Sequence, residues 1–457
     1  MDVVIDEGRI EAQLAAPPPD AAQVAAILAR ARELKGLGPE DVAALTRLEA
    51  PEALEQLFAA AAHVKETIYG PRVVLFAPLY VSNVCANECS YCAFRLSHDL
   101  PRRGLSTDEV TREVEALVRQ GHKRLLIVSG EALSNRYFDE LLEAIRAAYA
   151  VKLGNGEIRR INVNVAPLDV ARFKRLKEAD IGTYQLFQET YHLPTYQTVH
   201  RKGPKRDYAY RLDTMDRAME AGIDDVGIGV LLGLHDWRFE LLAMLQHVAH
   251  LERRFGVGPH TISVPRLEPA DGSSISRLPP WAVSDEDFLK LVAILRLAVP
   301  YTGIILSTRE QPELRRRALA LGVSQISAGS RTDVGGYSEL STSPGQFQLG
   351  DHRSLEEVVR DLAEMGYVPS FCTACYRLGR TGQDFMDLAK PGAIKNHCDP
   401  NALSTLVEYL CDHASPDTVR IGRGLVAERL AHMDDKRRRL TERLVSKVEA
   451  GQRDVLV

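Results

Sequence analysis

The sequence predicts an α/β fold, a complete (β/α)8 barrel of the TIM type with helical extensions before and after it. Apolar segments of strand length alternate with amphipathic segments of helical period through the middle of the chain. Eight such units in series imply parallel strands joined by right-handed crossovers, and closing that sheet gives a barrel. The chain of 457 residues is long enough for one large barrel with extensions.

The predicted strands and helices of the barrel alternate along the chain. The strands are predicted at residues 73–81, 124–128, 161–165, 183–187, 225–231, 261–264, 303–306 and 324–327. The helices are predicted at residues 108–119, 139–149, 168–179, 208–221, 239–255, 285–298, 312–321 and 355–365. Each strand is short and apolar, as expected for a parallel sheet that is covered by helices.

Both extensions show helical patterns. Before the barrel these patterns lie at residues 21–34, 39–47 and 52–68, and several open with acidic residues that suit a helix N-terminus. After the barrel, two helices are predicted at residues 401–413 and 418–450. We therefore expect three domains: a helical N-terminal extension at 1–70, the barrel at 71–366, and a C-terminal domain at 367–457.

Composition narrows the class of protein. A net charge of −5 and few aromatic residues give no sign of a nucleic-acid surface. The first residues lack a basic region leading into an apolar run, so no signal peptide is expected, and no segment is apolar over the length of a bilayer. Because thiols that bind metal need a reducing compartment, we expect the protein in the cytoplasm, without a membrane partner.

The most specific motif is the C-x3-C-x2-C run formed by Cys85, Cys89 and Cys92. Three thiolates at this spacing can bind three irons of a cubane 4Fe-4S cluster and leave the fourth iron open. An open iron can chelate the amino and carboxylate groups of S-adenosylmethionine (SAM) and pass the electron that cleaves its sulfonium. The spacing resembles that of the radical SAM superfamily. Zinc is the alternative, although it prefers four ligands and no fourth lies nearby in sequence.

A second group, C-x2-C-x22-C, is formed by Cys372, Cys375 and Cys398. Taken by itself, this pattern also fits a structural zinc site. A second triplet in a chain that already has one favours a second iron–sulfur cluster. The remaining thiol, Cys411, follows an apolar run and is expected to be an ordinary buried cysteine.

Ligand contacts are expected where the barrel strands end, and the first cysteine triplet follows the first strand. The second strand ends in Ser129, Gly130 and Glu131. The small residues allow a ligand to approach the backbone closely, and Glu131 can receive the ammonium of the methionyl group. A plain turn is the alternative interpretation of the same residues.

Three further side chains are candidate SAM contacts. Asn164 shares a strand face with Asn162, so one of the two is expected to contact a sugar or adenine. Glu189 follows the fourth strand, and Arg211 opens the following helix. Arg211 is the candidate for the ligand carboxylate because guanidinium and carboxylate pair in bidentate fashion, with a surface salt bridge as the alternative.

Three segments carry a closer resemblance, 181–191, 256–266 and 369–388, together with the C-x2-C-x22-C cysteines, of which Cys372 and Cys375 lie in the last segment. They resemble HydG, the radical SAM maturase family of FeFe-hydrogenases. The resemblance covers residues 64–450 or so. The related 2-iminoacetate synthases of thiamine biosynthesis (ThiH) share the barrel but lack the C-terminal cysteine motif.

The resemblance implies two clusters. The first triplet would hold the SAM-cleaving 4Fe-4S cluster, with Ser129, Gly130, Glu131 and Arg211 around SAM. The second triplet would hold an auxiliary 4Fe-4S cluster, extended by a labile fifth iron that is bound by a histidine and by a bridging, non-protein cysteine. His260 is the candidate for that histidine, since imidazole suits ferrous iron. A structural histidine is the alternative.

The resemblance also implies a reaction. Tyrosine would lose its side chain as p-cresol, and the dehydroglycine left would yield carbon monoxide and cyanide for an iron–cysteine synthon. A buried tyrosine carboxylate needs a cationic partner, for which Arg266 and Arg331 are the candidates. Ser307, Thr308 and Arg309 are weaker candidates for the same cavity. The implied partners are tyrosine, free cysteine, an electron donor such as ferredoxin or flavodoxin, and the maturation proteins that accept the synthon.

Two rival interpretations remain open on the sequence. The C-terminal cysteines could bind zinc and leave a tyrosine lyase of the ThiH type. Alternatively, the protein could be an iron–sulfur scaffold or carrier without radical chemistry, although carriers do not need a complete barrel. If the maturase interpretation holds, a closed and largely dry barrel with a continuous internal cavity between the two cysteine groups is expected.

Overall fold

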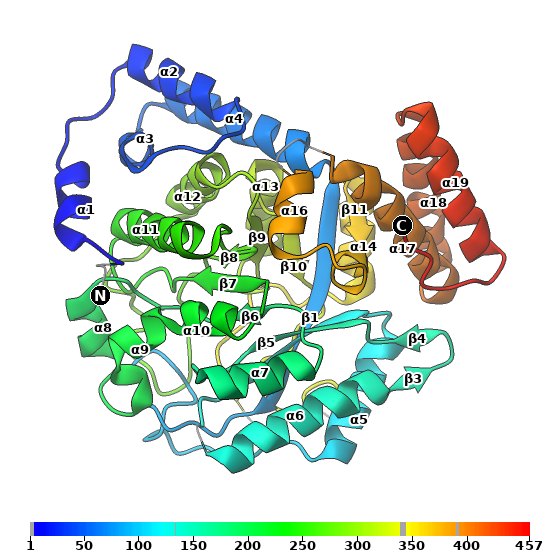
Figure 1. Cartoon of the computed structure of the whole chain (residues 1–457), viewed down its shortest axis with the longest axis horizontal. Helices are drawn as coiled ribbons and strands as arrows, with labels where there is room; N and C mark the ends of the chain where they lie inside the picture. The colour runs from blue at the N-terminus through cyan, green and yellow to red at the C-terminus, as the bar shows by residue number, and fades with distance from the viewer. Residues whose placement is uncertain (1–3, 133, 339–343, 390–392) are drawn as a thin grey trace.

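A computed structural model describes residues 4–132, 134–338, 344–389 and 393–457 of the chain. Eight parallel strands follow one another around a ring, and pairing of β10 with β1 closes it (Figure 1). These strands are β1 (Arg72–Ser82), β2 (Arg124–Ser129), β5 (Arg160–Asn164), β6 (Tyr184–Gln185), β7 (Val226–Gly229), β8 (Thr261–Ser263), β9 (Gly303–Leu306) and β10 (Gln325–Ser327). The predicted (β/α)8 barrel is therefore confirmed.

Amphipathic helices cover the outside of the barrel. They are α5 (Thr107–Arg119), α6 (Asn135–Ala150), α7 (Val170–Glu178), α10 (Thr214–Glu220), α11 (Trp237–Phe255), α12 (Asp285–Ala298), α13 (Pro312–Leu321) and α14 (Leu355–Glu364). Capping boxes at Ser106 and Ser354 fix where α5 and α14 begin. The helix predicted at 208–221 is instead α9 (Tyr208–Leu212) followed by α10. Asp213 separates them, with a non-helical ψ of 12°.

The N-terminal extension contains α1 (Glu7–Leu14), α2 (Ala21–Ala31), α3 (Pro39–Leu45) and α4 (Pro51–Tyr69). Helix α4 packs against α12 and α13, and α1 packs against α11, so the extension covers one side of the barrel (Figure 1). The sequence did not predict α1, nor the short α8 (Leu193–Val199), nor the hairpin of β3 (Lys152–Leu153) and β4 (Gly156–Glu157).

The C-terminal part starts with β11 (Val368–Ser370), a ninth strand that pairs with the beginning of β1. It continues through α15 (Ala374–Arg377), α16 (Gly382–Ala389), α17 (Lys395–Asp412), α18 (Pro416–Ala431) and α19 (Asp435–Glu449). The single helix predicted at 418–450 is wrong, because Asp434 caps a new helix by accepting from the Arg437 backbone N–H. Helix α17 begins before the predicted start at 401, with Pro400 inside it. The division into domains at 70 and 366 stays a prediction, and each of the three ranges includes residues outside the described set.

Part of the barrel interior is open rather than filled with the bulky branched residues usual for this fold. Inward positions of β7 and β9 are occupied by Gly227 and Gly303. A Cβ at Gly227 would lie 2.6 Å from Thr261 Oγ1, and one at Gly303 would lie 2.7 Å from Gln325 Nε2. The barrel is therefore built to leave interior space. In the part of the chain that the structure describes, no helix has the length and apolarity to cross a membrane.

Candidate active site

A cavity of about 180 Å³ lies at the C-terminal ends of the strands, and Cys85, Cys89 and Cys92 line it. We call it the first cavity. The loop that carries the thiols is held by an antiparallel bridge between Cys89 and His200. The Tyr91 hydroxyl lies 2.8 Å from His200 Nε2, which fixes the middle of the loop. Burial raises the pKa of all three thiols, so a bound cation is needed to stabilise them as thiolates.

Two acids and two bases form a network on one wall of the first cavity. Lys205 Nζ lies 2.7 Å from Glu189 and 3.1 Å from Glu131. Arg211 lies 3.0 Å from Glu131 and 3.5 Å from Glu189. Burial alone would raise the pKa of Glu131, but Arg211 and Lys205 lower it to about 2. Four fixed charges of balanced sign can receive a zwitterion, such as the methionyl group of SAM.

The candidate SAM contacts all line this cavity: Ser129, Gly130, Glu131, Asn164, Glu189 and Arg211. Gly130 approaches the cysteine loop so closely that a Cβ there would lie 2.4 Å from the carbonyl oxygen of Val84. A glycine is therefore required where the backbone passes the cluster loop. The roles of these six residues as ligand contacts stay a prediction.

Helix α11 stabilises the backbone that carries Glu189. Glu189 adopts a positive φ of 72°, which is strained for a residue with a side chain. The next two residues donate to the buried carboxylate of Glu240, through the Thr190 hydroxyl and the Tyr191 backbone N–H. The Tyr191 hydroxyl also contacts His247 of the same helix. These contacts stabilise the strained backbone and aim Glu189 into the cavity.

The opposite wall of the first cavity carries Arg309 and Glu268. Arg309 stacks its guanidinium 3.3 Å above the Phe347 ring and, within the described residues, has no acidic partner at ion-pair distance. Burial and the neighbouring Glu310 raise the pKa of Glu268 to about 7. This wall thus presents one cation and one carboxyl group that form no ion pair with the network around Glu131 in the described chain, although Glu189 acts electrostatically on Arg309.

The two arginines that the sequence favoured for a substrate carboxylate do not line the cavity. Arg266 is engaged by Glu310 and, at 2.8 Å, by Asp285. Arg331 is exposed, and its backbone N–H donates to the Tyr337 hydroxyl. Of the candidates, the weaker set Ser307, Thr308 and Arg309 is the one that lines the cavity.

A second cavity, of about 50 Å³, lies at the N-terminal ends of the strands. Cys372, Cys375 and Cys398 line it together with His260. His260 precedes β8, and its Nδ1 lies 3.6 Å from the buried carboxylate of Asp225. Burial lowers the pKa of His260, which keeps the imidazole neutral and able to bind a metal. The three thiols and the imidazole thus face one enclosed space, although the cysteines come from separate segments.

Arg72 and Arg124 line the second cavity, and Arg160 lies close enough to interact electrostatically with Cys375. Arg72, Arg124 and Arg160 each retain a buried N–H without a hydrogen-bond partner, and none has an acidic partner at ion-pair distance in the described chain. The thiols of Cys398, Cys372 and Cys375 raise the pKa of Arg72 against the opposing effect of burial. Unpaired buried cations are costly unless an anion is present. Their presence fits a negatively charged cluster bound by three thiolates.

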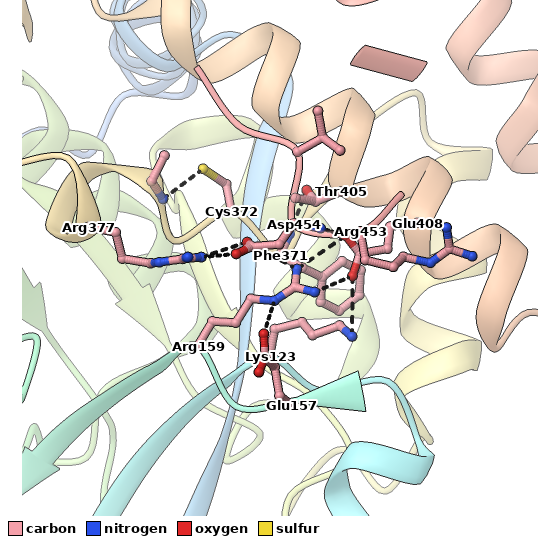
Figure 2. A network of polar contacts seen from close by, with 12 residues as sticks. Lys123, Glu157, Arg159, Phe371, Cys372, Arg377, Thr405, Glu408, Arg453 and Asp454 are labelled. Carbon is pink, nitrogen blue, oxygen red and sulfur yellow. Dashed lines mark hydrogen bonds and ion pairs between the residues drawn. The ribbon is translucent and has the colours of Figure 1, made fainter. Parts of the chain in front are cut away.

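An ion-pair network supports the second cavity from behind (Figure 2). Glu408 of α17 lies 2.7 Å from Arg159 and 3.4 Å from Lys123, and all three side chains are buried. Asp454 lies 3.5 Å from Arg159 and 2.5 Å from Arg377, two residues after Cys375. The network ties the helix that carries Cys398 to the barrel and to the segment that carries Cys375.

The donor geometry favours clusters over single ions. No group of three or more His, Cys, Asp or Glu side chains converges on one point as a single metal ion requires, as far as the described residues go. In a cubane cluster each thiolate binds a different iron, so the thiols stay apart around a shared space. Each triplet lines a single cavity, as the three thiolate ligands of a 4Fe-4S cluster would. Cys411, expected to be buried, is instead exposed on α17 near Arg423, so that prediction is wrong.

Comparison with known proteins agrees with this geometry. The radical SAM superfamily profile matches residues 79–246, and the biotin and thiamin synthesis associated domain matches 263–368. The 2-iminoacetate synthase of Escherichia coli K12 is 33% identical over 366 residues, which is 79% of this chain and 94% of that protein. The chain is a radical SAM enzyme, a class that binds a 4Fe-4S cluster and SAM.

Comparison with solved structures identifies the family within the radical SAM superfamily. A crystal structure of HydG, a maturase of the FeFe-hydrogenase, is 50% identical with a TM-score of 0.96, covering 99% of this chain and all of that one. HydG from Carboxydothermus hydrogenoformans is 43% identical with a TM-score of 0.82, covering 93% and 94% of the two chains. The chain belongs to the HydG family.

Sequence reasoning missed Lys205 and Glu268. Lys205 lies in a polar run with Arg201, Lys202 and Arg206, of which it alone is buried. No local signal separates it from its neighbours. Glu268 follows β8 at a strand end, where barrel geometry predicts ligand contacts, so that position was the available signal.

Proposed function

We propose that the protein is a radical SAM tyrosine lyase. It cleaves the Cα–Cβ bond of tyrosine to p-cresol and dehydroglycine, and it converts dehydroglycine to carbon monoxide and cyanide. These products join an iron–cysteine unit that is delivered for maturation of the FeFe-hydrogenase active site. The observation that carries this proposal is the pair of cysteine triplets, each lining its own cavity at opposite ends of one hollow barrel.

At the first cavity, Cys85, Cys89 and Cys92 would hold the SAM-binding cluster. When bound, this group supplies an electron that cleaves SAM to a 5′-deoxyadenosyl radical. Lys205 and Arg211 fit the methionyl carboxylate, while Glu131 and Glu189 fit its ammonium group. Asn164 lies on the same cavity wall, within reach of a nucleoside.

The substrate carboxylate is assigned to Arg309 in preference to Arg266 or Arg331, because Arg309 alone of the three lines the cavity. Phe347 packs under its guanidinium and orients it. The loop that carries Gln346 and Phe347 closes over this wall, and the Tyr80 hydroxyl donates to Gln346 at 2.8 Å. Closure of this kind excludes water from a reactive intermediate.

At the second cavity, Cys372, Cys375 and Cys398 would hold the auxiliary 4Fe-4S cluster. The labile iron is cargo, for which His260 is the protein ligand and free cysteine the bridging one. Arg72, Arg124 and Arg160 supply positive charge for the anionic cluster and for cyanide. Further partners are an electron donor such as ferredoxin or flavodoxin, and the maturation proteins that receive the iron unit.

The test is an anaerobic assay of the iron-reconstituted protein with SAM, dithionite, cysteine and tyrosine. p-Cresol, cyanide and carbon monoxide should all form, in comparable amounts. p-Cresol with glyoxylate and ammonia in place of cyanide and carbon monoxide would support the second candidate, a 2-iminoacetate synthase, which the 33% identical relative favours. Absence of reductive SAM cleavage would exclude both and favour an iron–sulfur carrier.

A further inference from the structure

The first cavity contains a carboxyl group that the SAM site does not use. Glu268 lines the cavity, yet among the described residues it makes no hydrogen bond and no ion pair. The two other carboxylates of this cavity, Glu131 and Glu189, are each paired with Lys205 and Arg211. An unpaired carboxyl group in a partly desolvated cavity is costly, which points to a ligand that satisfies it.

The position of Glu268 is fixed relative to the first cysteine triplet. It lies between Leu267, whose N–H donates to the Leu232 carbonyl at 2.8 Å, and Pro269. Further along the same loop, the Ser273 hydroxyl donates to the carbonyl oxygen of Ser90 in the cysteine loop, at 2.8 Å. The loop after β8 is thus attached to the loop that carries Cys89 and Cys92. Glu268 is held at a constant place beside the reaction centre.

The wall that carries Glu268 also carries Arg309, and the two are close enough to interact electrostatically. An α-amino acid carries one carboxylate and one ammonium group, both bonded to the same carbon. Arg309 fits the carboxylate, and Glu268 is the remaining group of opposite charge on this wall. The cavity therefore offers two zwitterion sites, one around Glu131 for SAM and one formed by Arg309 and Glu268.

We propose that Glu268 receives the substrate ammonium group and acts as its general base. This inference rests on the proposed function, because it takes an amino acid as the substrate. In this step the ammonium group transfers one proton to the Glu268 carboxylate, which leaves a neutral substrate amine and a neutral Glu268 carboxylic acid. No electron moves and no other bond changes. Only the neutral amine has the lone pair that stabilises a nitrogen radical after a hydrogen atom is removed.

The environment of Glu268 suits a base that works near neutral pH. Its pKa of about 7 results from burial and from Glu310, against the opposing effects of Arg309 and Arg266. A carboxylate with an ordinary pKa would be a poor proton acceptor at neutral pH. Above pH 7 Glu268 is ionised and can accept a proton, whereas below pH 7 it is protonated and cannot.

The experiment compares three proteins in the reconstituted form. Glu268→Gln keeps the shape of the side chain and removes the base. Glu268→Asp keeps the carboxyl group. Asp271→Asn is the control, since Asp271 lies on the same loop but does not line the cavity. We measure p-cresol formation and tyrosine binding between pH 6 and 9, and SAM cleavage without tyrosine.

The wild-type rate of p-cresol formation should fall as the pH is lowered through about 7. Glu268→Gln should lower that rate roughly a hundredfold and abolish the pH dependence, as loss of a general base does. Glu268→Asp should still show a fall in the rate of p-cresol formation at low pH. Asp271→Asn should have the same rate and pH profile as the wild type. Tyrosine affinity should fall in Glu268→Gln, whereas 3-(4-hydroxyphenyl)propanoate, which lacks the amine, should bind both proteins equally. Its equal binding also shows that the variant is folded.

The outcomes separate this inference from the function on which it rests. If the wild type forms no p-cresol from tyrosine, the proposed function fails and the inference fails with it. If the wild type is active and Glu268→Gln has the same rate, affinity and pH profile, only the inference is overturned. Equal loss of affinity for tyrosine and for the amine-free analogue would also overturn it, because the effect would then not involve the amine.

Discussion

The two ends of the barrel both present three thiols to a cavity, but they differ in volume and charge. The first cavity measures about 180 Å³, and its charges are largely paired within the network of Glu131, Glu189, Lys205 and Arg211. The second measures about 50 Å³ and is surrounded by arginines without acidic partners. The first end therefore suits exchange of large zwitterionic ligands, and the second suits one anionic group that stays in place.

The same strands build both ends. Along β1, Val74 lines the second cavity and Phe76 the first. Likewise, Gln325 of β10 lines the second cavity and Ser327 the first. Successive inward residues are roughly 6–7 Å apart along a strand, so one layer of side chains separates the two spaces. The continuous cavity expected from the sequence is therefore wrong for the described residues: one layer of side chains divides it into two cavities, and small residues such as Gly227 keep that layer thin.

The largest expected effect comes from removing one thiol at either end of the barrel, because each removal should abolish a different set of products. Cys89→Ala should abolish p-cresol, cyanide and carbon monoxide together, because every product depends on the first cluster. Cys398→Ala should leave p-cresol formation within about twofold of the wild type while cyanide and carbon monoxide become undetectable. All three products are measured in the same anaerobic reaction. Loss of p-cresol in Cys398→Ala, with the first cluster intact by electron paramagnetic resonance, would contradict independent ends.

The next prediction concerns the layer of side chains between the two cavities. A Cβ on Gly227 would lie 2.8 Å from Gln185 Cγ as well as close to Thr261, so Gly227→Ala must narrow the interior. We expect cyanide formation to fall roughly tenfold relative to p-cresol, as misplacement inside an active site does. The ratio of the two products is the measurement.

Gly424→Ala is the matched control for that prediction. Gly424 lies in α18, and a Cβ there would have no atom within 4 Å. Its product ratio should equal that of the wild type. An unchanged ratio in Gly227→Ala would mean that intermediates do not pass through the barrel interior.

Single arginines at the two ends should have different effects. Arg124→Met at the second cavity removes a buried cation beside the thiols, so the auxiliary cluster should dissociate several-fold faster. Arg309→Met at the first cavity should instead raise the tyrosine concentration needed for half-maximal p-cresol formation by roughly tenfold or more. Iron content after gel filtration and tyrosine dependence of the rate distinguish them. The reverse pattern of effects would contradict these roles of Arg124 and Arg309.

The sequence specified the barrel and both triplets because their signals are local. Each of the eight strands is an apolar run beside an amphipathic helix, and cysteine spacing is readable without structure. Strand β11 was not predicted, because Pro369 interrupts its apolar pattern and the strand gains its stability from pairing with Arg72 to Val74 of β1. The residues of the candidate site follow the same rule, since those without a local sequence signal were not predicted. Nothing local distinguishes Lys205, which turns inward, from its exposed neighbour Lys202, since that choice depends on Glu131 and Glu189.

The smallest effect concerns stability at the second end. Glu408 is enclosed between Arg159 and Lys123 (Figure 2), and these cations lower its pKa against the opposing effect of burial. Glu408→Gln should lower the free energy of unfolding by about 3 kcal/mol, as expected when a buried pair loses one partner. Glu449→Gln breaks a pair with Arg423 that is largely exposed, and should cost about 0.5 kcal/mol or less. Chemical denaturation of both variants gives the comparison.

The difference in unfolding free energy between the wild type and Glu408→Gln should depend on pH if it arises from the charge of Glu408. Because the folded-state pKa of Glu408 lies below the unfolded value of 4.5, the ion pairs contribute fully above pH 4.5. The contribution is lost as the pH falls through the folded-state pKa, when the carboxylate takes up a proton. The gap between wild type and Glu408→Gln should therefore be constant from pH 8 to pH 6 and shrink at acidic pH. A gap that persists unchanged at low pH would assign the stabilisation to packing of the side chain rather than to its charge, and the second end would then owe its rigidity to α17 alone.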